Sequence, residues 1–365
     1  MKISIGILAY NEAAEIGTTL HSLFEQSIFK QPETYQKIEA IEIVVVPNGC
    51  SDNTAAISRE TLLQLVETFT HPNISWQVYE VEQPGKPNAW NLYVHEYSNP
   101  AADYLIVMDA DIQLLEGGTL DALICTLEQK PDAWVSVDMP IKDVALKQKT
   151  NLIEKLSLSV SKVTGAKSAW ISQLYCCRPA LLRNIWMPLG VIVEDGFLWS
   201  MIVTNSLTSP TVVDRVVRAD SASHAFEAYI DIKSLLRHEV RQVMGNTINA
   251  FLYEDLRANC LQPEDLGLLV KKRNEQEPLW VNKLIQAAMA KRGWWVVDRF
   301  MLLRRILGLQ YAPLKKAILL SPVAGLAFVV DLLVCLQANI ELHKWSKSSY
   351  GETQAIDNRY WRLDW

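Results

Sequence analysis

Short apolar runs alternate with stretches of helical spacing through the first 140 residues, and this alternation limits the possible fold more than any other feature. Runs of strand length, rich in apolar and β-branched residues, occupy 3–9, 41–46, 76–81, 104–108 and 133–137. Between them, apolar residues recur at helical spacing over 12–24, 51–69, 88–97 and 119–129. Alternating strands and helices build a mainly parallel sheet with helices on both faces. We therefore predict an α/β fold with a Rossmann-like sheet.

The pattern becomes less regular after residue 150. We predict a strand at Ile171–Cys177, a helix at Phe197–Thr204 and an edge strand at Thr211–Val217. From Ile230 onward helical spacing prevails, with predicted breaks at Pro263, Pro278, Pro313 and Pro322. These changes divide the chain into a sheet domain, 1–245, and a helical C-terminal region, 246–365.

The six cysteines are scattered, with no C-x-x-C pair and no metal-type spacing, so they indicate apolar residues of a reducing compartment. Met1-Lys2 leads directly into an apolar run that ends before Asn11-Glu12, which is not a signal-peptide pattern. We expect a cytoplasmic protein.

Positive charge is concentrated in one stretch of a chain whose net charge is −6. Residues 271–316 hold eleven Lys and Arg and three acidic residues, a local net charge of +8. The same stretch contains Trp280, Trp294 and Trp295. Basic, tryptophan-containing helices suit an anionic membrane surface better than a nucleic acid. The alternative is a solvated helical face.

The most apolar segment is 317–336, which Ser321-Pro322 interrupts. The remaining run of fourteen residues, Val323–Leu336, still contains Asp331. A spanning helix needs about 20 apolar residues. We favour an interfacial or re-entrant helix; a full span and a buried core helix remain open.

Polar residues follow three of the predicted strands at the point where each strand ends. These loops are Ala9-Tyr10-Asn11-Glu12, Pro47-Asn48-Gly49-Cys50-Ser51-Asp52 and Asp109-Ala110-Asp111. Ligands of open α/β sheets bind beyond the carboxyl ends of the strands. The polar residues therefore gather where that rule places a binding site.

Asp109 and Asp111 form a D-x-D pair directly after the predicted strand Tyr104–Met108. Carboxylates at the end of a buried strand are costly unless something positive binds them. Hard oxygen ligands suit Mg²⁺ or Mn²⁺, and such a cation neutralises charge on a departing diphosphate. The pair predicts a divalent-metal site.

Glu194 and Asp195 follow three apolar residues and precede a predicted helix. A carboxylate pair beside apolar residues suits a general base, because burial raises a carboxyl pKa. The alternative is simple helix capping by Asp195.

Four further residues are candidates with structural alternatives. Lys86 follows Gly85 near a predicted helix start, where it can reach a phosphate. Arg237 and Arg241 lie four residues apart on one helix face and either bind a diphosphate or form surface ion pairs. His224 is a lone histidine, either structural or a further metal ligand after the D-x-D pair.

These segments, in this order, resemble the family 2 glycosyltransferases, which have the GT-A fold. The matching segments are 8–12, 48–54, 85–91, Asp109-Ala110-Asp111, Gln173-Leu174-Tyr175 and Glu194-Asp195. The resemblance covers about residues 1–245. It implies transfer of a sugar from a nucleoside-diphosphate sugar, of the UDP or GDP type, with Mn²⁺ or Mg²⁺.

The resemblance also implies roles for individual residues. It places Asp111 on the metal, Asp109 near the ribose and diphosphate, and Asp195 as the base that deprotonates the acceptor hydroxyl with inversion. The loop residues Ala9, Tyr10, Asn11, Glu12, Asn48 and Asp52 then line the nucleotide pocket, with Gln173 on the acceptor side.

Two departures from the family pattern matter. The acidic residue that usually precedes the glycine of the second motif is replaced by Asn48, which can still form hydrogen bonds. Gln242 stands where processive members carry a tryptophan, after Arg241, which favours transfer of a single sugar. The C-terminal region resembles membrane-docking extensions of transferases with lipid acceptors, although a saccharide acceptor also fits.

Three rival functions remain. A pseudoenzyme would bind a nucleotide sugar without turnover, and a peripheral membrane scaffold would ignore donor and metal. A nucleotidylyltransferase usually carries a Gly-rich loop with Arg after its first strand, and the loop from Ala9 to Glu12 has neither.

Overall fold

The computed structural model describes residues 1–30, 37–68, 73–145, 169–227, 231–259, 262–308 and 314–348. The chain divides into two compact units. The first comprises 1–189, 194–228 and 260–271, and the second comprises 190–193, 229–259 and 272–365. The boundary that we placed at residue 245 lies inside a continuous helix, α9 (Ile232–Asn259).

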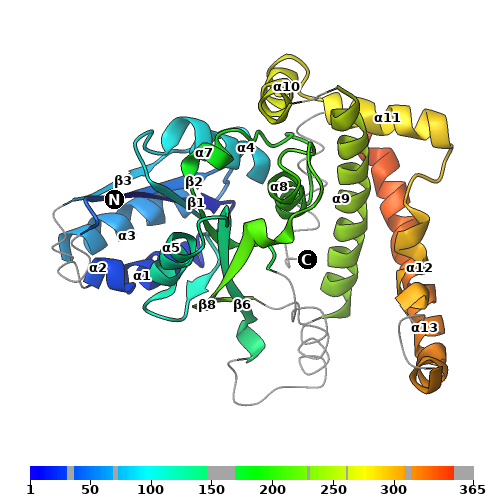
Figure 1. The fold of residues 1–365 in the computed structure, drawn as a ribbon, viewed down its shortest axis with the longest axis horizontal. Coiled ribbons are helices and arrows are strands. Elements are labelled where there is room, and N and C mark those ends of the chain that lie inside the picture. Colours follow the sequence, from blue (N-terminus) through cyan, green and yellow to red (C-terminus); the bar gives the residue numbers. More distant parts are fainter. Residues whose placement is uncertain are drawn as a thin grey trace. The chain divides into compact units, whose positions relative to one another are not determined.

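The first unit is built on an eight-stranded sheet (Figure 1). Its order is β3 (Ile74–Val78), β2 (Ala40–Pro47), β1 (Lys2–Ala9), β4 (Tyr104–Asp109), β7 (Leu174–Cys177), β6 (Val135–Lys142), β8 (Val216–Phe226) and β5 (Gln113–Leu114). Strands β1 to β4 are parallel, and so are β6 and β8. β7 is antiparallel to both of its neighbours, and β5 is antiparallel to β8. The predicted mainly parallel α/β sheet is confirmed.

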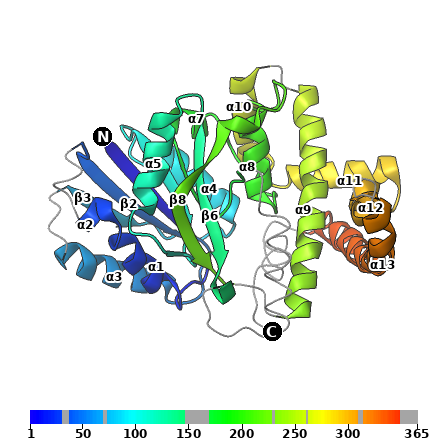
Figure 2. The ribbon, with the colours of Figure 1, turned by 60° about the horizontal axis from the view of Figure 1, so that its bottom comes forward.

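Helices flank this sheet, as the turned view in Figure 2 also shows. They are α1 (Ile16–Phe24), α2 (Ser27–Lys30), α3 (Thr54–Thr68), α4 (Lys86–Leu92) with the π-helical turn η1 (Tyr93–Tyr97), α5 (Thr119–Gln129), α7 (Pro179–Leu182) and α8 (Glu194–Val203). A further helix, α10 (Pro263–Gln276), begins in the first unit and ends in the second.

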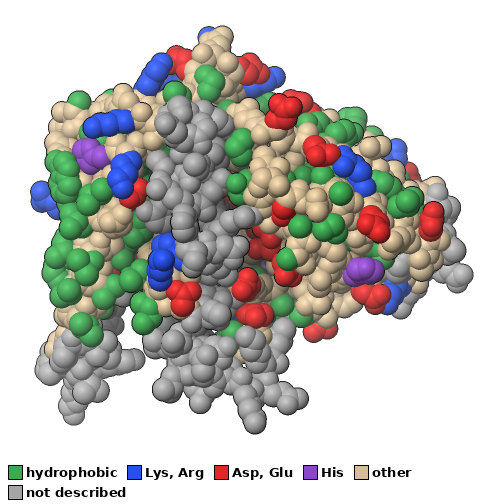
Figure 3. Space-filling model, turned by 180° about the vertical axis from the view of Figure 1, so that it is seen from behind, with side chains coloured by type: hydrophobic (Ala, Val, Ile, Leu, Met, Phe, Trp, Pro, Cys, Tyr) green, Lys and Arg blue, Asp and Glu red, His purple; other side chains and the backbone are tan. Residues whose placement is uncertain are grey.

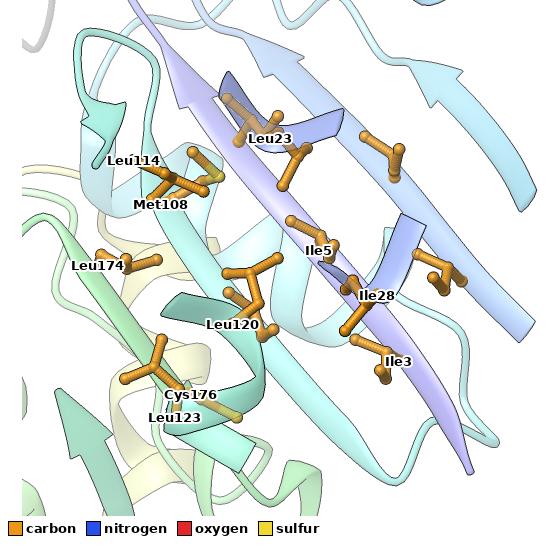
Figure 4. Close-up of a cluster of buried hydrophobic side chains, with 14 of the residues drawn as sticks. Ile3, Ile5, Leu23, Ile28, Met108, Leu114, Leu120, Leu123, Leu174 and Cys176 are labelled. Atoms are coloured by element: carbon orange, nitrogen blue, oxygen red, sulfur yellow. The ribbon is translucent and has the colours of Figure 1, made fainter. Parts of the chain in front are cut away.

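One face of the sheet carries the main core (Figure 4). Leu23 of α1, Ile28 of α2 and Leu120 of α5 are fully buried against strand residues such as Ile5 and Met108. Burying large aliphatic side chains supplies most of the driving force for this layer.

The opposite face of β1 is covered by η1. The hydroxyl of Tyr93 donates to the carbonyl of Ser4 at 2.9 Å. A Cβ on Gly6 would lie 2.4 Å from the Tyr93 ring, so only glycine lets the ring approach the strand. This contact fixes the helix that begins with Lys86.

Two of the predicted elements differ clearly from the structure. The helix predicted from Glu12 begins at Ile16, because Asn11 adopts a left-handed conformation (φ 55°) and the chain turns before the helix. The predicted edge strand Thr211–Val217 is wrong: Val213–Arg215 form a 3₁₀ turn (η3), and β8 begins at Val216. β8 is not at an edge, since the short strand β5 pairs with its far side.

The second unit is helical, as predicted for the C-terminal region. It contains α9, α11 (Trp280–Arg292), α12 (Arg299–Gly308) and α13 (Leu314–Trp345). The side chain of Asn282 donates to the carbonyl of Trp345 at 2.8 Å, and that of Asn339 accepts from the Val296 amide at 2.9 Å. The first bond joins α11 to α13, and the second joins α13 to the segment between α11 and α12.

The predicted break at Pro322 is also wrong, because α13 runs without interruption from Leu314 to Trp345. A proline inside a helix removes one backbone hydrogen bond and costs about 3 kcal/mol. A helix of 32 residues that packs on α9 and α12 retains enough other bonds and contacts to continue.

Candidate active site

The loops after β1 and β2 are bonded to one another. The side-chain oxygen of Asn11 accepts from the Ser51 and Asp52 amides at 2.6 and 3.2 Å. The Asp52 carboxylate accepts from the amides of Thr54, at 3.1 Å, and of Ala13, at 3.2 Å. Asp52 therefore caps α3 and ties it to the first loop, so both side chains shape the loops at the carboxyl ends of the strands.

Asn48 joins three loops. It is buried; its amide nitrogen donates to the Ala9 carbonyl at 2.8 Å, and its amide oxygen accepts from the Gly85 amide at 2.9 Å. We predicted that this amide can bond a nucleotide, but it is bonded to backbone on both sides. Asn48 instead sets the position of Gly85 and of Lys86, which follows.

Tyr10 and Glu12, which we also predicted at the pocket, are half-buried in the first loop. The Glu12 amide donates to the Thr54 hydroxyl at 2.7 Å, a further link between this loop and α3. The whole loop is thus held by its backbone.

Lys86, Asp109 and Glu194 meet at the centre of the site. The ammonium nitrogen of Lys86, the first residue of α4, lies 2.7 Å from Oδ1 of Asp109 at the end of β4. It also lies 3.1 Å from Oε1 of Glu194, the first residue of α8. Asp109 and Glu194 are buried and Lys86 is 26% exposed. Three separate segments thus converge on one ion-pair cluster.

The electrostatics of this cluster favour additional positive charge. Burial raises the pKa of Asp109 to about 7, and the nearby carboxylates of Asp111 and Glu194 add to the rise although Lys86 opposes it. Partial desolvation likewise raises the pKa of Asp111. Burial alone would lower the pKa of Lys86, but Asp109 and Glu194 outweigh burial and raise it. Each raised pKa means that the group keeps its proton more tightly than it would in water. A bound cation would be favoured at the site for the same reason.

A pocket opens beside the cluster. Lys86, Asp109 and Glu194 line it together with Gln173 and Asp195. Its apolar walls include Leu8, Trp90, Val107, Ile171, Met187 and Leu198. The structure therefore brings the predicted acceptor-side residue and both predicted catalytic carboxylates to one pocket.

Asp195 lies within the first turn of α8, since that helix begins at Glu194. One of its oxygens accepts from the Gly196 amide at 2.7 Å. The helix-capping alternative placed Asp195 before the helix, whereas the structure places it inside the helix and at the pocket wall.

His224 is fully buried in β8. Its Nδ1 lies 2.6 Å from Oδ2 of Asp138 and its Nε2 lies 3.2 Å from Oε1 of Gln173. The ring lies close enough to Asp111 to influence that carboxyl electrostatically. Within the part of the chain that the structure describes, no three His, Cys, Asp or Glu side chains cluster as a metal site.

Arg237 and Arg241 belong to the second unit. Arg237 donates to the Ser234 hydroxyl at 3.3 Å. Arg241 is buried and donates to the Ile192 carbonyl within the same unit. This bond restrains the segment 190–193 that leads into Glu194, a role that the i, i+4 spacing did not predict.

Several residues of the site were not predicted from the sequence. The indole of Trp90 donates to the Tyr175 hydroxyl at 2.6 Å inside the pocket wall. Both residues lie in segments that matched the family, where aromatic residues beside polar ones were an available signal. The signal for Asp138 was clearer, because this carboxylate directly follows the predicted strand 133–137.

The comparisons with known proteins agree with this architecture. Residues 4–184 match the model of the family described as glycosyl transferase family 2. No curated protein sequence matches the chain.

Two of the similar solved structures are described by their bound ligands. One is the mannosyltransferase PcManGT from Pyrobaculum calidifontis in complex with GDP-Man and Mn²⁺, at 18% identity and a TM-score of 0.51, with 95% of this chain and 88% of that chain covered. The other is glucosyl-3-phosphoglycerate synthase from Mycobacterium tuberculosis, in complex with Mn²⁺, UDP-glucose and phosphoglyceric acid, at 16% identity and a TM-score of 0.43, with 67% and 77% covered. The first likeness confirms the predicted GT-A type of fold.

The family match begins in β1 and includes the D-x-D pair at the end of β4, and the fold is that of a glycosyltransferase. Residues 4–184 therefore form a glycosyl transferase family 2 domain.

Proposed function

We propose that this chain is an inverting, metal-dependent glycosyltransferase that moves one sugar from a nucleoside-diphosphate sugar to an acceptor hydroxyl. One observation carries the proposal: Lys86, Asp109 and Glu194 form a cluster that favours added positive charge, and Asp195 lies in the same pocket. Anion-binding and proton-accepting groups are thus adjacent, as transfer from a diphosphate requires.

The donor end of the site fits a hard divalent cation, Mn²⁺ or Mg²⁺. Asp109 and Asp111 offer carboxylate oxygens whose pKa values are raised mainly by burial, so a bound cation would stabilise their charged forms. Asp111 and His224 would hold the metal, and the diphosphate and water would complete its coordination, which is how Mg²⁺ is usually bound. When bound, the cation neutralises the charge of the leaving nucleoside diphosphate.

The nucleotide of the donor is of the UDP or GDP type. The backbone-bonded loops that contain Asn11, Asn48 and Asp52 form the carboxyl-end rim on which such sheets bind nucleotides. Lys86, at the N-terminus of α4, provides a cation for the phosphates. The mannosyltransferase of similar fold contains GDP-Man, which is consistent with this class of donor.

Asp195 is the base of the transfer step. Both adjacent carboxylates line the pocket; Glu194 is held by the Lys86 ammonium at 3.1 Å, and Asp195 stands where the family motif has the base. Asp195 accepts the proton of the acceptor hydroxyl while the hydroxyl oxygen bonds to the anomeric carbon. The bond from that carbon to the diphosphate oxygen breaks, and the nucleoside diphosphate leaves with its electron pair. Attack opposite the leaving group inverts the anomeric centre.

We further propose that the enzyme works at the cytoplasmic side of the cell membrane, on a lipid, lipid-linked or saccharide acceptor. The second unit carries an exposed apolar face, defined here as Phe300, Leu303 and Ile306 of α12 and Leu326, Val329 and Leu333 of α13. Green side chains gather at the left edge of the view in Figure 3, over these helices. The α13 residues recur at intervals of three and four and so share one side of the helix.

Interfacial docking agrees better with this helix than a membrane span does. Ala324–Trp345 is long and apolar enough to cross a membrane, but 39% of its most apolar window is buried inside the protein. Asp331 points away from the apolar face and is bonded to Arg304 at 3.1 Å. A helix with one side packed on its own protein and the other side apolar suits the plane of a lipid surface.

Calorimetric titration of UDP and GDP tests the proposal, with Mn²⁺ and then with a chelator. We expect one nucleotide to bind only with the metal, and Asp111→Asn to abolish that binding. Donor hydrolysis with UDP-glucose and GDP-mannose then separates an enzyme from a pseudoenzyme, which binds without turnover. If neither nucleotide binds under any metal condition, the transferase proposal fails and a membrane scaffold remains.

A further inference from the structure

Three polar side chains, two of them buried, form a row that leads from the sheet to the pocket. Asp138 of β6, His224 of β8 and Gln173, just before β7, are joined by contacts of 2.6 and 3.2 Å. Asp138 is 1% exposed and His224 is not exposed at all. His224 lies between Pro140 of β6 and Leu114 of β5 in the sheet, so its backbone position is fixed on both sides.

The proton positions follow from the chemistry of the partners. Asp138 offers a carboxylate oxygen at 2.6 Å, so the Nδ1 of His224 carries a hydrogen and donates it. Nε2 then faces the side-chain amide of Gln173. Either it donates a second proton to the amide oxygen, or its lone pair accepts from the amide nitrogen after the amide turns over. Only the lone-pair form can bind a metal.

A carboxylate is energetically unfavourable at the position of Asp138. Its second oxygen, Oδ1, is buried and has no hydrogen-bond partner among the described residues. A buried carboxylate with an unsatisfied oxygen costs free energy that an apolar residue would not cost. A role in orienting the ring of His224 can account for that cost. Metal-binding histidines commonly donate their other N–H to a carboxylate, which fixes the ring.

We propose that Asp138 is a positioning residue that fixes the ring of His224 with the Nε2 lone pair toward the metal side, and that Gln173 occupies this nitrogen until the metal displaces it. The inference rests on the proposed function and extends it. Gln173 also lines the pocket that contains Asp195. Loading of the metal therefore releases a side chain on the acceptor side, which couples donor binding to the shape of the acceptor pocket.

The two arms of the proposal predict opposite effects on metal affinity. Asp138→Asn should weaken Mn²⁺ binding by about 10- to 100-fold, the range for loss of a carboxylate that orients a ligand. Gln173→Ala should tighten Mn²⁺ binding by about three- to tenfold, because one competing hydrogen bond is removed. Asp132→Asn, an exposed carboxylate before the same strand β6, and Gln113→Ala, an exposed amide in β5, are the matched controls and should change nothing.

The measurement is electron paramagnetic resonance of Mn²⁺ titrated into each variant with saturating UDP or GDP. Spin-echo modulation from a directly bound ¹⁴N gives a second readout, which a purely structural role of Asp138 would not alter. We expect this modulation in the wild type, its loss in His224→Gln and its weakening in Asp138→Asn.

The possible outcomes are distinguishable. If the wild type binds Mn²⁺ and Asp138→Asn binds it equally well with the same modulation, the positioning role is wrong while the transferase proposal stands. If Gln173→Ala weakens binding, Gln173 is itself a ligand and not a competitor. If the wild type binds no Mn²⁺, both the metal-dependent function and this inference are overturned. Should Asp138→Asn not fold, the Gln173 variant still decides whether His224 Nε2 is held in competition with the metal.

Discussion

The ammonium of Lys86 lies 2.7 Å from a carboxylate oxygen of Asp109, which joins the start of α4 to the end of β4. Both groups are largely removed from solvent, so neither is well placed without the other. The same ammonium reaches Glu194, the residue before the proposed base. One cation thereby connects the donor end of the pocket to the acceptor end.

Replacement of Lys86 by Met should lower the free energy of unfolding by up to about 3 kcal/mol, because it leaves Asp109 without its partner. Urea unfolding measures the change. Lys30→Met is the matched control: its exposed pair with Glu25 should be worth no more than about 1 kcal/mol. Equal effects of the two substitutions would show that burial does not strengthen the Lys86 pair.

The stability of the metal-free protein should depend on pH through Asp109. Its folded-state pKa of about 7 lies above the ordinary 3.8, so the folded protein holds this proton more tightly than the unfolded chain. The stabilising contribution is complete below about pH 4 and is lost as pH rises through 7. Relative to Asp109→Asn, the wild type should lose stability across this window and then level off. A relative gain across the same window would mean that the Lys86 attraction outweighs burial.

Gly49→Ala should destabilise the protein by about 1–3 kcal/mol and weaken nucleotide binding. Gly49 has a positive φ of 62°, and a Cβ there would lie 2.4 Å from the Pro84 side chain. The substitution therefore displaces the loop that precedes Lys86. Gly118→Ala serves as control, because its Cβ would meet nothing within 4 Å. Thermal unfolding and nucleotide titration of both variants check the prediction.

Asp195→Asn should leave donor binding intact and reduce turnover by about 10²–10⁴, the usual contribution of a general base. The isosteric amide preserves the bond from the Gly196 amide but cannot take a proton. Donor titration and steady-state kinetics on the same sample separate the two effects. Near-normal turnover would assign the proton to another group, and a loss of donor binding would make Asp195 a binding residue.

Substitution of Leu326 and Leu333 by Glu should abolish binding to vesicles that contain phosphatidylglycerol. These side chains are 70% and 60% exposed on the apolar face, and each large apolar residue removed from water contributes about 1.5–3 kcal/mol. Leu268→Glu, at a side chain 64% exposed on α10, is the control.

Vesicle co-sedimentation and sedimentation velocity, run together, decide what covers the apolar face. Binding to phosphatidylglycerol vesicles, stronger than to neutral ones, is the result that we expect from the basic stretch 271–316. A dimer in solution that the two glutamates dissociate, with no vesicle binding, would instead identify the face as a contact between protein chains.

Local patterns predicted the regular elements well. Thr119–Gln129 is helical over the predicted bounds, and β4 extends only one residue past the predicted Tyr104–Met108. Both are continuous amphipathic or apolar runs whose period alone defines them. The rule that ligands bind beyond the carboxyl ends of the strands also predicted correctly that Asp109 lies beside the other loop residues. Neighbouring parallel strands end at the same edge of the sheet.

Pairings between distant segments could not be predicted. Strand β8 lies between β6 and β5, although both partners precede it by many residues, and nothing near Val216 in the sequence indicates them. The structural role of Asn48 was equally difficult to predict. Its motif indicated a contact with a nucleotide, but its side chain bonds to Gly85, which lies in the loop after another strand. Buried partners such as Asp138 and His224 are fixed by the sheet order, which the sequence pattern did not determine.

The division into units has a consequence for how such a protein can be dissected or recombined. The chain passes between the two units five times, at 189/190, 193/194, 228/229, 259/260 and 271/272. The second unit even includes 190–193, the four residues directly before Glu194 and Asp195. No single cut in the chain separates the two units. A cut at 271/272, the last crossing, would remove α11, α12 and α13 but would leave α9 and residues 190–193, which belong to the same unit, attached to the first unit. A fragment that keeps the whole second unit together must therefore also contain part of the first.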